Sequence, residues 1–151
     1  MSQFEGCFSL SEGEQSLVWT ANDENFIVLA SEQDENQVFI LTLSTDPVTV
    51  NEKLFWSANI NKQSDQLILK VQENSQGNMG VFLQGDEYSF LIPFSDRGFN
   101  ETIPFEVYSN SGENFAWADE NESTALVLVN STPPDGAKKK WIIKPATHFV
   151  Q

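Results

Sequence analysis

The sequence predicts an all-β fold with three repeats of about four strands each. Short runs of apolar, β-branched and aromatic residues recur along the whole chain, and no long window shows the period of an amphipathic helix. The gaps between these runs are rich in Asn, Asp, Gly, Ser and Pro, which favour turns. Weak self-similarity between the two ends of the chain indicates the repeats. Residues 1–151 are expected to form one domain, because this length and 40% apolar content suffice for one core.

Twelve segments have the composition of strands. Each is a short apolar run bounded by residues that favour turns. In chain order they are residues 7–10, 17–20, 26–30, 38–43, 53–58, 67–71, 80–84, 88–94, 103–108, 115–118, 125–129 and 140–145.

The first and last copies of the repeat can be aligned directly. The alignment matches Trp19 with Trp117 and Phe39 with Trp141, and the offset drifts only slightly. A large aromatic residue at the same place in each copy is most simply a core residue, so the tryptophans are interpreted as core rather than as platforms for sugar rings. The segment "NDEN" at residues 22–25 is then expected to be the turn that follows the core strand at residues 17–20.

The middle copy is expected to begin with the segment "KLFWSANINKQSDQLILKV". Trp56 takes the role of Trp19 in this alignment, and either "YSFLIPF" or "GVFLQ" closes the copy. The segment at residues 85–105 interrupts the repeat with extra Phe and Pro, which predicts either a projecting loop or ordinary irregular packing.

The closing segment "PDGAKKKWIIKP" resembles the last strand of ricin-B-like β-trefoil domains, a family that includes small fungal lectins and protease inhibitors. The resemblance implies a single β-trefoil and a lectin or inhibitor function. Lys139 occupies the position of the glutamine in the family's Gln-x-Trp motif. The segments "SLVWTAN", "LFWSAN" and "QENSQGNMGVFL" are similar to stretches of bulb-type mannose lectins, which also have threefold symmetry. A β-prism and a β-sandwich remain open as alternatives.

The net charge of -14 limits the expected partners. A surface this negative repels phosphate backbones and anionic lipids, so neither nucleic acid nor a membrane is expected as a partner. Residues 1–52 hold ten acidic residues and no Lys or Arg, whereas four of the eight basic residues lie within residues 138–144. Attraction between the two ends of the chain is therefore expected. The N-terminus lacks the features of a signal peptide, which predicts a cytoplasmic or leaderless secreted protein.

Polar turn residues are the candidate ligand-binding groups. Acid and amide side chains at Asp23, Asn25, Asp119 and Asn121 follow two matched tryptophans and could hydrogen-bond the hydroxyls of a glycan or glycoprotein. The same residues also favour simple hairpin turns. No motif for catalysis, metal or cofactor binding is present, and His148 has no nucleophile motif to serve. We therefore expect a carbohydrate-binding protein that is not an enzyme and needs no cofactor or metal.

Two other functions remain open. On the same scaffold, a protruding loop at residues 85–100 could enter the active site of a protease, with Arg97 as the specificity residue for a trypsin-like enzyme. An acidic structural or interaction protein is the third possibility, suggested by the uneven charge.

Overall fold

The computed structural model describes residues 2–12, 16–32, 37–62, 67–85, 87–119, 127–129, 133, 135 and 137–144. Within these residues the chain forms ten strands and no α-helix. The strands are β1 (Ser2–Leu10), β2 (Leu17–Ala21), β3 (Ile27–Ser31), β4 (Phe39–Leu43), β5 (Val48–Val50), β6 (Lys53–Lys62), β7 (Ile68–Glu73), β8 (Met79–Gln84), β9 (Phe90–Pro93) and β10 (Trp141–Lys144). The expected all-β fold is confirmed.

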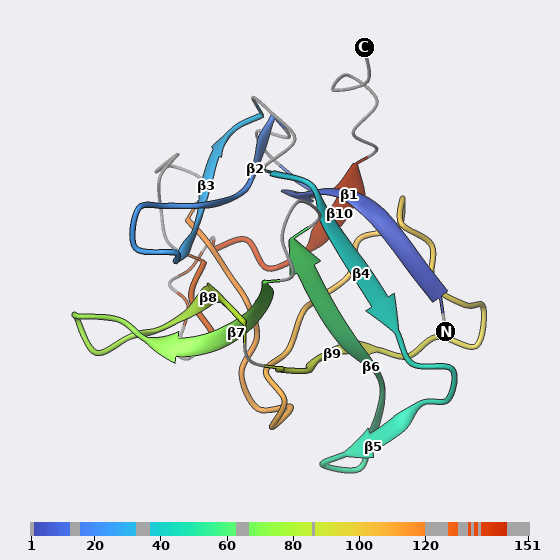
Figure 1. The fold of residues 1–151 in the computed structure, drawn as a ribbon. Coiled ribbons are helices and arrows are strands. Elements are labelled where there is room, and N and C mark those ends of the chain that lie inside the picture. The colour runs from blue at the N-terminus through green and yellow to red at the C-terminus, as the bar shows by residue number, and fades with distance from the viewer. Residues whose placement is uncertain are drawn as a thin grey trace.

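Five of these strands and one further segment close a six-membered antiparallel barrel. Side by side in the barrel lie β1, β4, β6 and β9 (Figure 1). Residues 105–108 follow, because Tyr108 bridges Leu91 of β9 and Phe105 bridges Trp141 of β10. Strand β10 then pairs with β1 and completes the ring. A closed barrel leaves no free sheet edge among its members.

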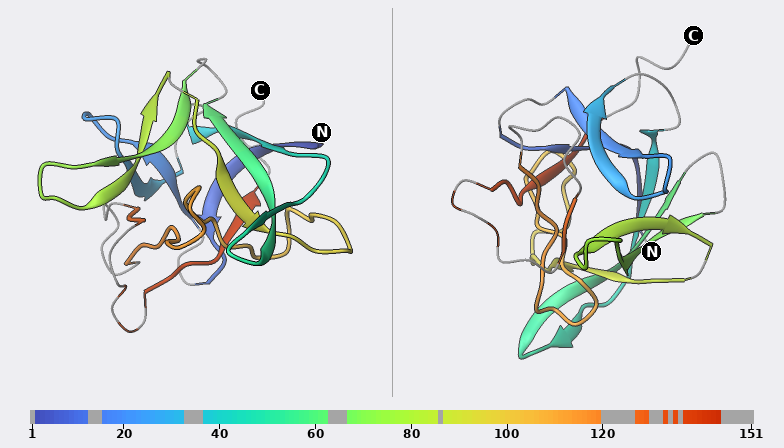
Figure 2. Two further views of the ribbon diagram at one scale, coloured as in Figure 1. Left: turned by 90° about the horizontal axis from the view of Figure 1, so that it is seen from below. Right: turned by 90° about the vertical axis from the view of Figure 1, so that its left-hand side faces the viewer.

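Three hairpins cap one end of this barrel. Two are β2–β3 and β7–β8, and the third joins Trp117 to Leu128. The hairpins meet one another, since Val127 donates its backbone N–H to Ile27 and accepts one from Val81. The right-hand view of Figure 2 faces this side of the molecule, with the blue β2–β3 hairpin and the green β7–β8 hairpin toward the viewer. This arrangement is a β-trefoil.

The closing strand of each repeat places a large aromatic side chain in the core. In each repeat this residue pairs with the adjacent first strand of the same repeat. The three residues are Phe39, Phe90 and Trp141, and all are fully buried. The predicted match of Phe39 with Trp141 is therefore confirmed. The core interpretation of the tryptophans is also confirmed, because all four are buried.

The predicted role of Trp56 in the middle repeat is wrong. Trp19 lies in β2 and pairs with Leu29 of β3. The residue in the same relation within the second repeat is Val71, which pairs with Val81, whereas Trp56 lies in the barrel strand β6. The segments around Trp19 and Trp56 both read apolar-Trp-polar-Ala, and a strand pattern alone does not distinguish a barrel strand from a hairpin strand.

The "NDEN" segment forms the turn of the first hairpin. The side-chain oxygen of Asn22 accepts the backbone N–H groups of Glu24 and Phe26, at 2.9 and 3.0 Å. Asn25 has a left-handed backbone with φ of 67°, which Asn tolerates better than most residues. In the second hairpin Asn74 makes the same pair of bonds, so this turn is a repeated feature of the fold.

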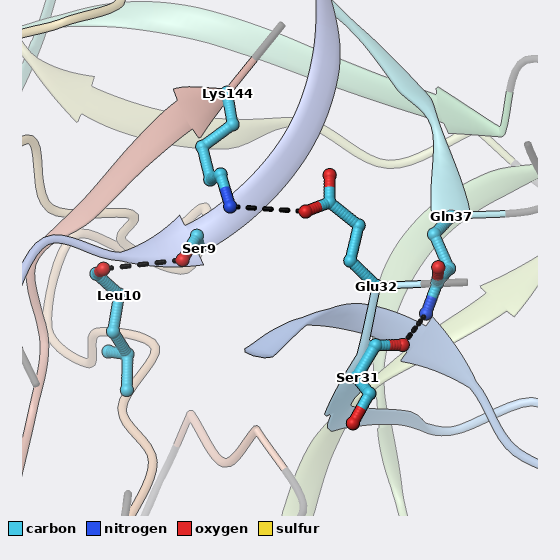
Figure 3. Close-up of polar contacts among 6 residues, drawn as sticks. All are labelled: Ser9, Leu10, Ser31, Glu32, Gln37 and Lys144. Carbon is cyan, nitrogen blue, oxygen red and sulfur yellow. Dashed lines mark hydrogen bonds and ion pairs between the residues drawn. The ribbon is translucent and has the colours of Figure 1, made fainter. Parts of the chain in front are cut away.

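Ion pairs join the acidic N-terminal third to the C-terminal lysines. Lys144 of β10 lies 3.1 Å from a carboxylate oxygen of Glu32, directly after β3 (Figure 3). Lys138 lies 3.7 Å from Glu12. Nearby, the amide of buried Gln37 donates to the backbone carbonyl of Ser31 at 2.8 Å. The expected attraction between the two ends of the chain is confirmed by these contacts.

Cys7 is fully buried beside this network, and its thiol is expected to be inert. Burial and the charge of Glu32 raise the pKa of the thiol to about 12, so almost no thiolate forms at neutral pH. The folded chain holds the thiol proton more tightly than the unfolded chain does. The free energy of unfolding is therefore unaffected by this group below about pH 9 and falls as the pH rises toward 12.

Alkylation of Cys7 by iodoacetamide at pH 8, followed by mass spectrometry, should label the urea-unfolded chain and not the folded one. Rapid labelling of the folded chain would contradict this expectation.

Candidate functional site

The predicted site residues of the first repeat are exposed on the β2–β3 turn. Asp23 and Asn25 are solvent-exposed, and neither lines any of the hollows described below. The backbone carbonyl of Asn25 accepts the N–H of Leu83 in β8, which binds the turn to the second repeat. The turn thus has a clear structural task, and ligand binding by Asp23 and Asn25 stays a prediction.

The remaining predicted residues belong to the third repeat. Asp119 is half-buried and follows Ala118, which bridges Lys138. Asn121 lies outside the described residues. Ligand binding by Asp119 and Asn121 therefore also stays a prediction.

The predicted protruding loop at residues 85–100 is interrupted by a core strand. Strand β9 occupies Phe90–Pro93 in the middle of this segment, and Phe90 is fully buried. The segment is thereby divided into a part before β9 and a part after it. There Arg97 is exposed in a tight turn that Gly98 closes with a bond to Ser95. Inhibition of a protease through Arg97 stays a prediction.

The surface between the second and third repeats carries a hollow of about 280 Å³, here called the inter-repeat hollow. Tyr88 comes from the segment before β9, and a polar turn at residues 109–114 faces it from the next repeat. The hollow is lined by Val71, Met79, Tyr88, Ser109, Asn110, Ser111, Asn114 and Val129.

Backbone bonds hold the turn at residues 109–114 in one conformation. Ser109 accepts the N–H of Gly112 and donates its own to Asn114, at 2.9 and 2.8 Å. Gly112 has a φ of 75°, which a residue with a Cβ rarely adopts. Asn51, on the turn between β5 and β6, donates its side-chain amide to the carbonyl of Ser111 at 2.9 Å. The side chains of this turn are therefore presented from a fixed backbone.

Tyr88 links the two sides of the inter-repeat hollow. Its hydroxyl accepts the backbone N–H of Asn110 at 3.3 Å, and its ring packs edge-on against Phe90 with centroids 4.8 Å apart. Burial raises the pKa of Tyr88 above its usual value, so the hydroxyl stays protonated at neutral pH and keeps an O–H to donate.

The polar groups of the inter-repeat hollow are uncharged and of both kinds. Among the described residues, no hydrogen bond engages the side-chain amides of Asn110 and Asn114, so each offers a donor and an acceptor. No acidic or basic residue among those that the structure describes lines the hollow, although the chain carries 22 acidic residues. Apolar contact from the two valines completes a surface suited to a neutral ligand that has both hydroxyl groups and C–H faces.

Sequence reasoning did not identify this group of residues. The available signals were the polar run "SNSGEN" at residues 109–114 and one of only two tyrosines in the chain, at Tyr88. Neither signal indicates that the two segments touch, because 22 positions separate Tyr88 from Asn110.

Comparison with known structures shows the same fold in other proteins. A ricin B-like lectin of Macrolepiota procera, solved in complex with lactose, matches with a TM-score of 0.62. The match has 11% sequence identity and covers 96% of this chain and 97% of the lectin. A Caenorhabditis elegans protein of unknown function matches with a TM-score of 0.61 and 9% identity, covering 93% of each chain. The likeness is one of fold.

Sequence comparison adds no relative. No protein-family model matches the chain, and no curated protein matches it. In the part of the chain that the structure describes, no helix is long and apolar enough to cross a membrane.

Proposed function

We propose that this protein is a non-enzymatic, lectin-like protein that holds a neutral glycan in the inter-repeat hollow. The observation that carries the proposal is the lining of this hollow, which combines the side-chain amides of Asn110 and Asn114 with hydroxyls and apolar contacts and, among the described residues, has no charged side chain. Sugar hydroxyls both donate and accept hydrogen bonds, so they need partners of both kinds. The shared fold with a lectin that was solved with lactose supports the same class of ligand.

Each lining group has a distinct part in binding. The amides of Asn110 and Asn114 would bond adjacent hydroxyls of one sugar ring, and the Tyr88 O–H would donate to a third oxygen. Val71 and Val129 would contact the apolar face of the ring. The hollow is shallow and partly open to solvent, so we expect modest affinity for one sugar, which several copies on one glycan would raise by multivalency.

The proposal predicts that the double variant Asn110→Ala/Asn114→Ala loses most of the sugar affinity. Two neutral hydrogen bonds of about 1 kcal/mol each correspond to roughly a thirtyfold weaker Kd. A glycan array should first identify the bound sugar, and calorimetric titration of that sugar should then compare the variant with the unmodified protein.

The variant Asp23→Ala is the matched control, because it removes a polar turn side chain that does not line the hollow. Its affinity should be unchanged. Loss of binding in Asp23→Ala or Asp119→Ala, with normal binding in the double variant, would move the site to the hairpin turns. An array and titrations without any bound sugar would refute the proposed function.

A further inference from the structure

A second and larger hollow lies at the end of the barrel opposite the hairpins. The loop at residues 94–104 crosses this end beside the N-terminus (Figure 1). Phe99 anchors the loop, because its ring packs against Phe4, Trp56 and Phe105 from the first strands of the three repeats, with centroids 4.7, 6.0 and 5.2 Å away. Phe99 therefore acts as a plug. One side of this plug borders a hollow of about 420 Å³, here called the barrel-end hollow.

Two consecutive tight turns hold the rim of the barrel-end hollow. Before Phe99, Ser95 accepts the backbone N–H of Gly98 at its carbonyl and that of Arg97 at its hydroxyl. After Phe99, Asn100 accepts the N–H of Ile103 at its carbonyl and the N–H of Thr102 at its side chain. The rim is thus preorganised by its own hydrogen bonds, which lowers the entropy cost of binding a ligand.

Most of the free polar groups on this rim are donors. The side-chain oxygen of Asn100 is occupied by the N–H and the hydroxyl of Thr102, at 2.9 and 2.7 Å, so its NH₂ group remains for a ligand. The hydroxyl oxygen of Ser95 uses one lone pair for the Arg97 N–H at 3.2 Å, so Ser95 retains its O–H donor and one acceptor lone pair. The guanidinium of Arg97 has only donors. A set in which donors predominate is complementary to an anion and less well matched to a sugar hydroxyl, which also needs acceptors.

Among the described residues, Arg97 is the only charged residue that lines the barrel-end hollow, and it is the only arginine in the sequence. Within the same described residues, no ion pair engages its guanidinium. The neighbouring acids Asp96 and Glu101 do not line the hollow. At physiological ionic strength the Debye length is about 8 Å, so exposed negative charges farther than this from Arg97 are largely screened.

The rest of the lining is apolar. Besides Trp56 and Phe99 it includes Ile92, Pro93, Pro104 and Phe105, together with Ile103, which is one of two exposed large apolar side chains in the described part of the chain. A volume of about 420 Å³ is within the range of small-molecule sites and too small for a folded partner.

We propose that the barrel-end hollow binds a small organic carboxylate with an apolar body. The carboxylate would bond Arg97 and the NH₂ group of Asn100, while an aromatic ring or branched chain would lie on Trp56, Phe99 and Ile103. This site is separate from the inter-repeat hollow and does not depend on sugar binding.

Titration with phenylacetate tests the proposal, and phenylacetamide provides a neutral ligand of the same shape. Backbone and side-chain amide signals of Gly98 and Asn100 in a ¹H–¹⁵N spectrum report binding at this hollow. Phenylacetate should shift these signals with a millimolar Kd, and phenylacetamide should bind at least tenfold more weakly. Arg97→Met keeps an apolar stem without the guanidinium, and it should weaken phenylacetate at least tenfold and leave phenylacetamide unchanged.

Lys140→Met is the matched control, because it removes one positive charge at a residue that lines a different hollow. It should bind phenylacetate as the unmodified protein does. Equal affinity for the two ligands would overturn the proposal, and so would unchanged phenylacetate binding in Arg97→Met. Absence of shifts at Gly98 and Asn100 up to the solubility limit would also overturn it. Loss of sugar binding has no bearing on these outcomes.

Discussion

Trp141→Ala is expected to lower the free energy of unfolding by about 3–5 kcal/mol, the usual range for truncating a large buried aromatic side chain. Trp141 is fully buried, its ring lies edge-on to Trp19 with centroids 5.2 Å apart, and its indole N–H donates to the carbonyl of Ala116 at 3.3 Å. It also lies in β10, which joins the third repeat to β1 and closes the barrel. Since whole domains are stable by only about 5–15 kcal/mol, much of this protein should unfold at moderate urea concentration. Urea unfolding followed by circular dichroism measures the difference.

The variant Trp141→Phe tests how much of this loss comes from the empty volume that Ala leaves in the core. The equivalent residues of the other repeats are Phe39 and Phe90, so a phenylalanine ring is already accommodated at this position of the fold. The Phe variant should therefore be clearly more stable than the Ala variant, although it gives up the bond to Ala116. Equal destabilisation by the two substitutions would contradict our account of Trp141 as a core residue whose main role is to fill volume.

The parts of the fold that could be predicted are those that leave a local pattern. The closing strands could be aligned because Phe39 and Trp141 lie in apolar runs near both ends of the chain. In the middle repeat the sequence pattern matches Trp56 with Trp19, because both are tryptophans in similar apolar segments. The residue that occupies the position of Trp19 in the second repeat is Val71. Val is a common strand residue and carries no signal of its own. The third repeat also pairs through isolated bridges at Phe105, Trp117 and Leu128, where full strands were expected.

The candidate sites depend on contacts between repeats, which local pattern cannot show. Tyr88 meets the turn at residues 109–114 only because the barrel strands between them bring the two segments together. The same applies to Phe99, whose ring packs against Phe4 of the first strand although the two residues lie far apart in the sequence. The predicted turn residues Asp23 and Asn25 were found by composition, and composition alone does not distinguish a structural turn from a binding turn.

The charge of the chain was partly informative. The uneven distribution of acids and lysines led to an expected attraction, and the pair between Lys144 and Glu32 shows it. The total of -14 gives no indication that no acidic residue, among those that the structure describes, lines the inter-repeat hollow or the barrel-end hollow. Charge on a protein of this size lies mainly on its outer surface, so the net value describes solubility and long-range attraction rather than a binding site.

Gly6→Ala is expected to destabilise the protein by about 2–3 kcal/mol or more, through a clash where the barrel closes. Gly6 lies in β1 opposite Phe39, and a Cβ there would meet the carbonyl oxygen of Lys144 and lie 2.7 Å from a side-chain carbon of Ile143. Backbone atoms of β10 cannot rotate away as a side chain can, so the strands must separate. Separation would also disturb Cys7, which pairs with Lys144. We therefore expect a lower urea midpoint together with faster alkylation of the thiol.

Gly85→Ala is the control for Gly6→Ala, since its backbone is not left-handed and its added Cβ would lie 4.0 Å from the nearest atom, on Leu67. This change should alter the free energy of unfolding by less than about 0.5 kcal/mol and leave Cys7 unreactive. Both variants share the general effect of replacing glycine on the entropy of the unfolded chain. The difference between their free energies of unfolding therefore reports the clash between β1 and β10 alone. Equal urea midpoints for Gly6→Ala and Gly85→Ala would mean that β10 can move away from β1 at little cost. The close contact between β1 and β10 would then not be what protects the thiol of Cys7.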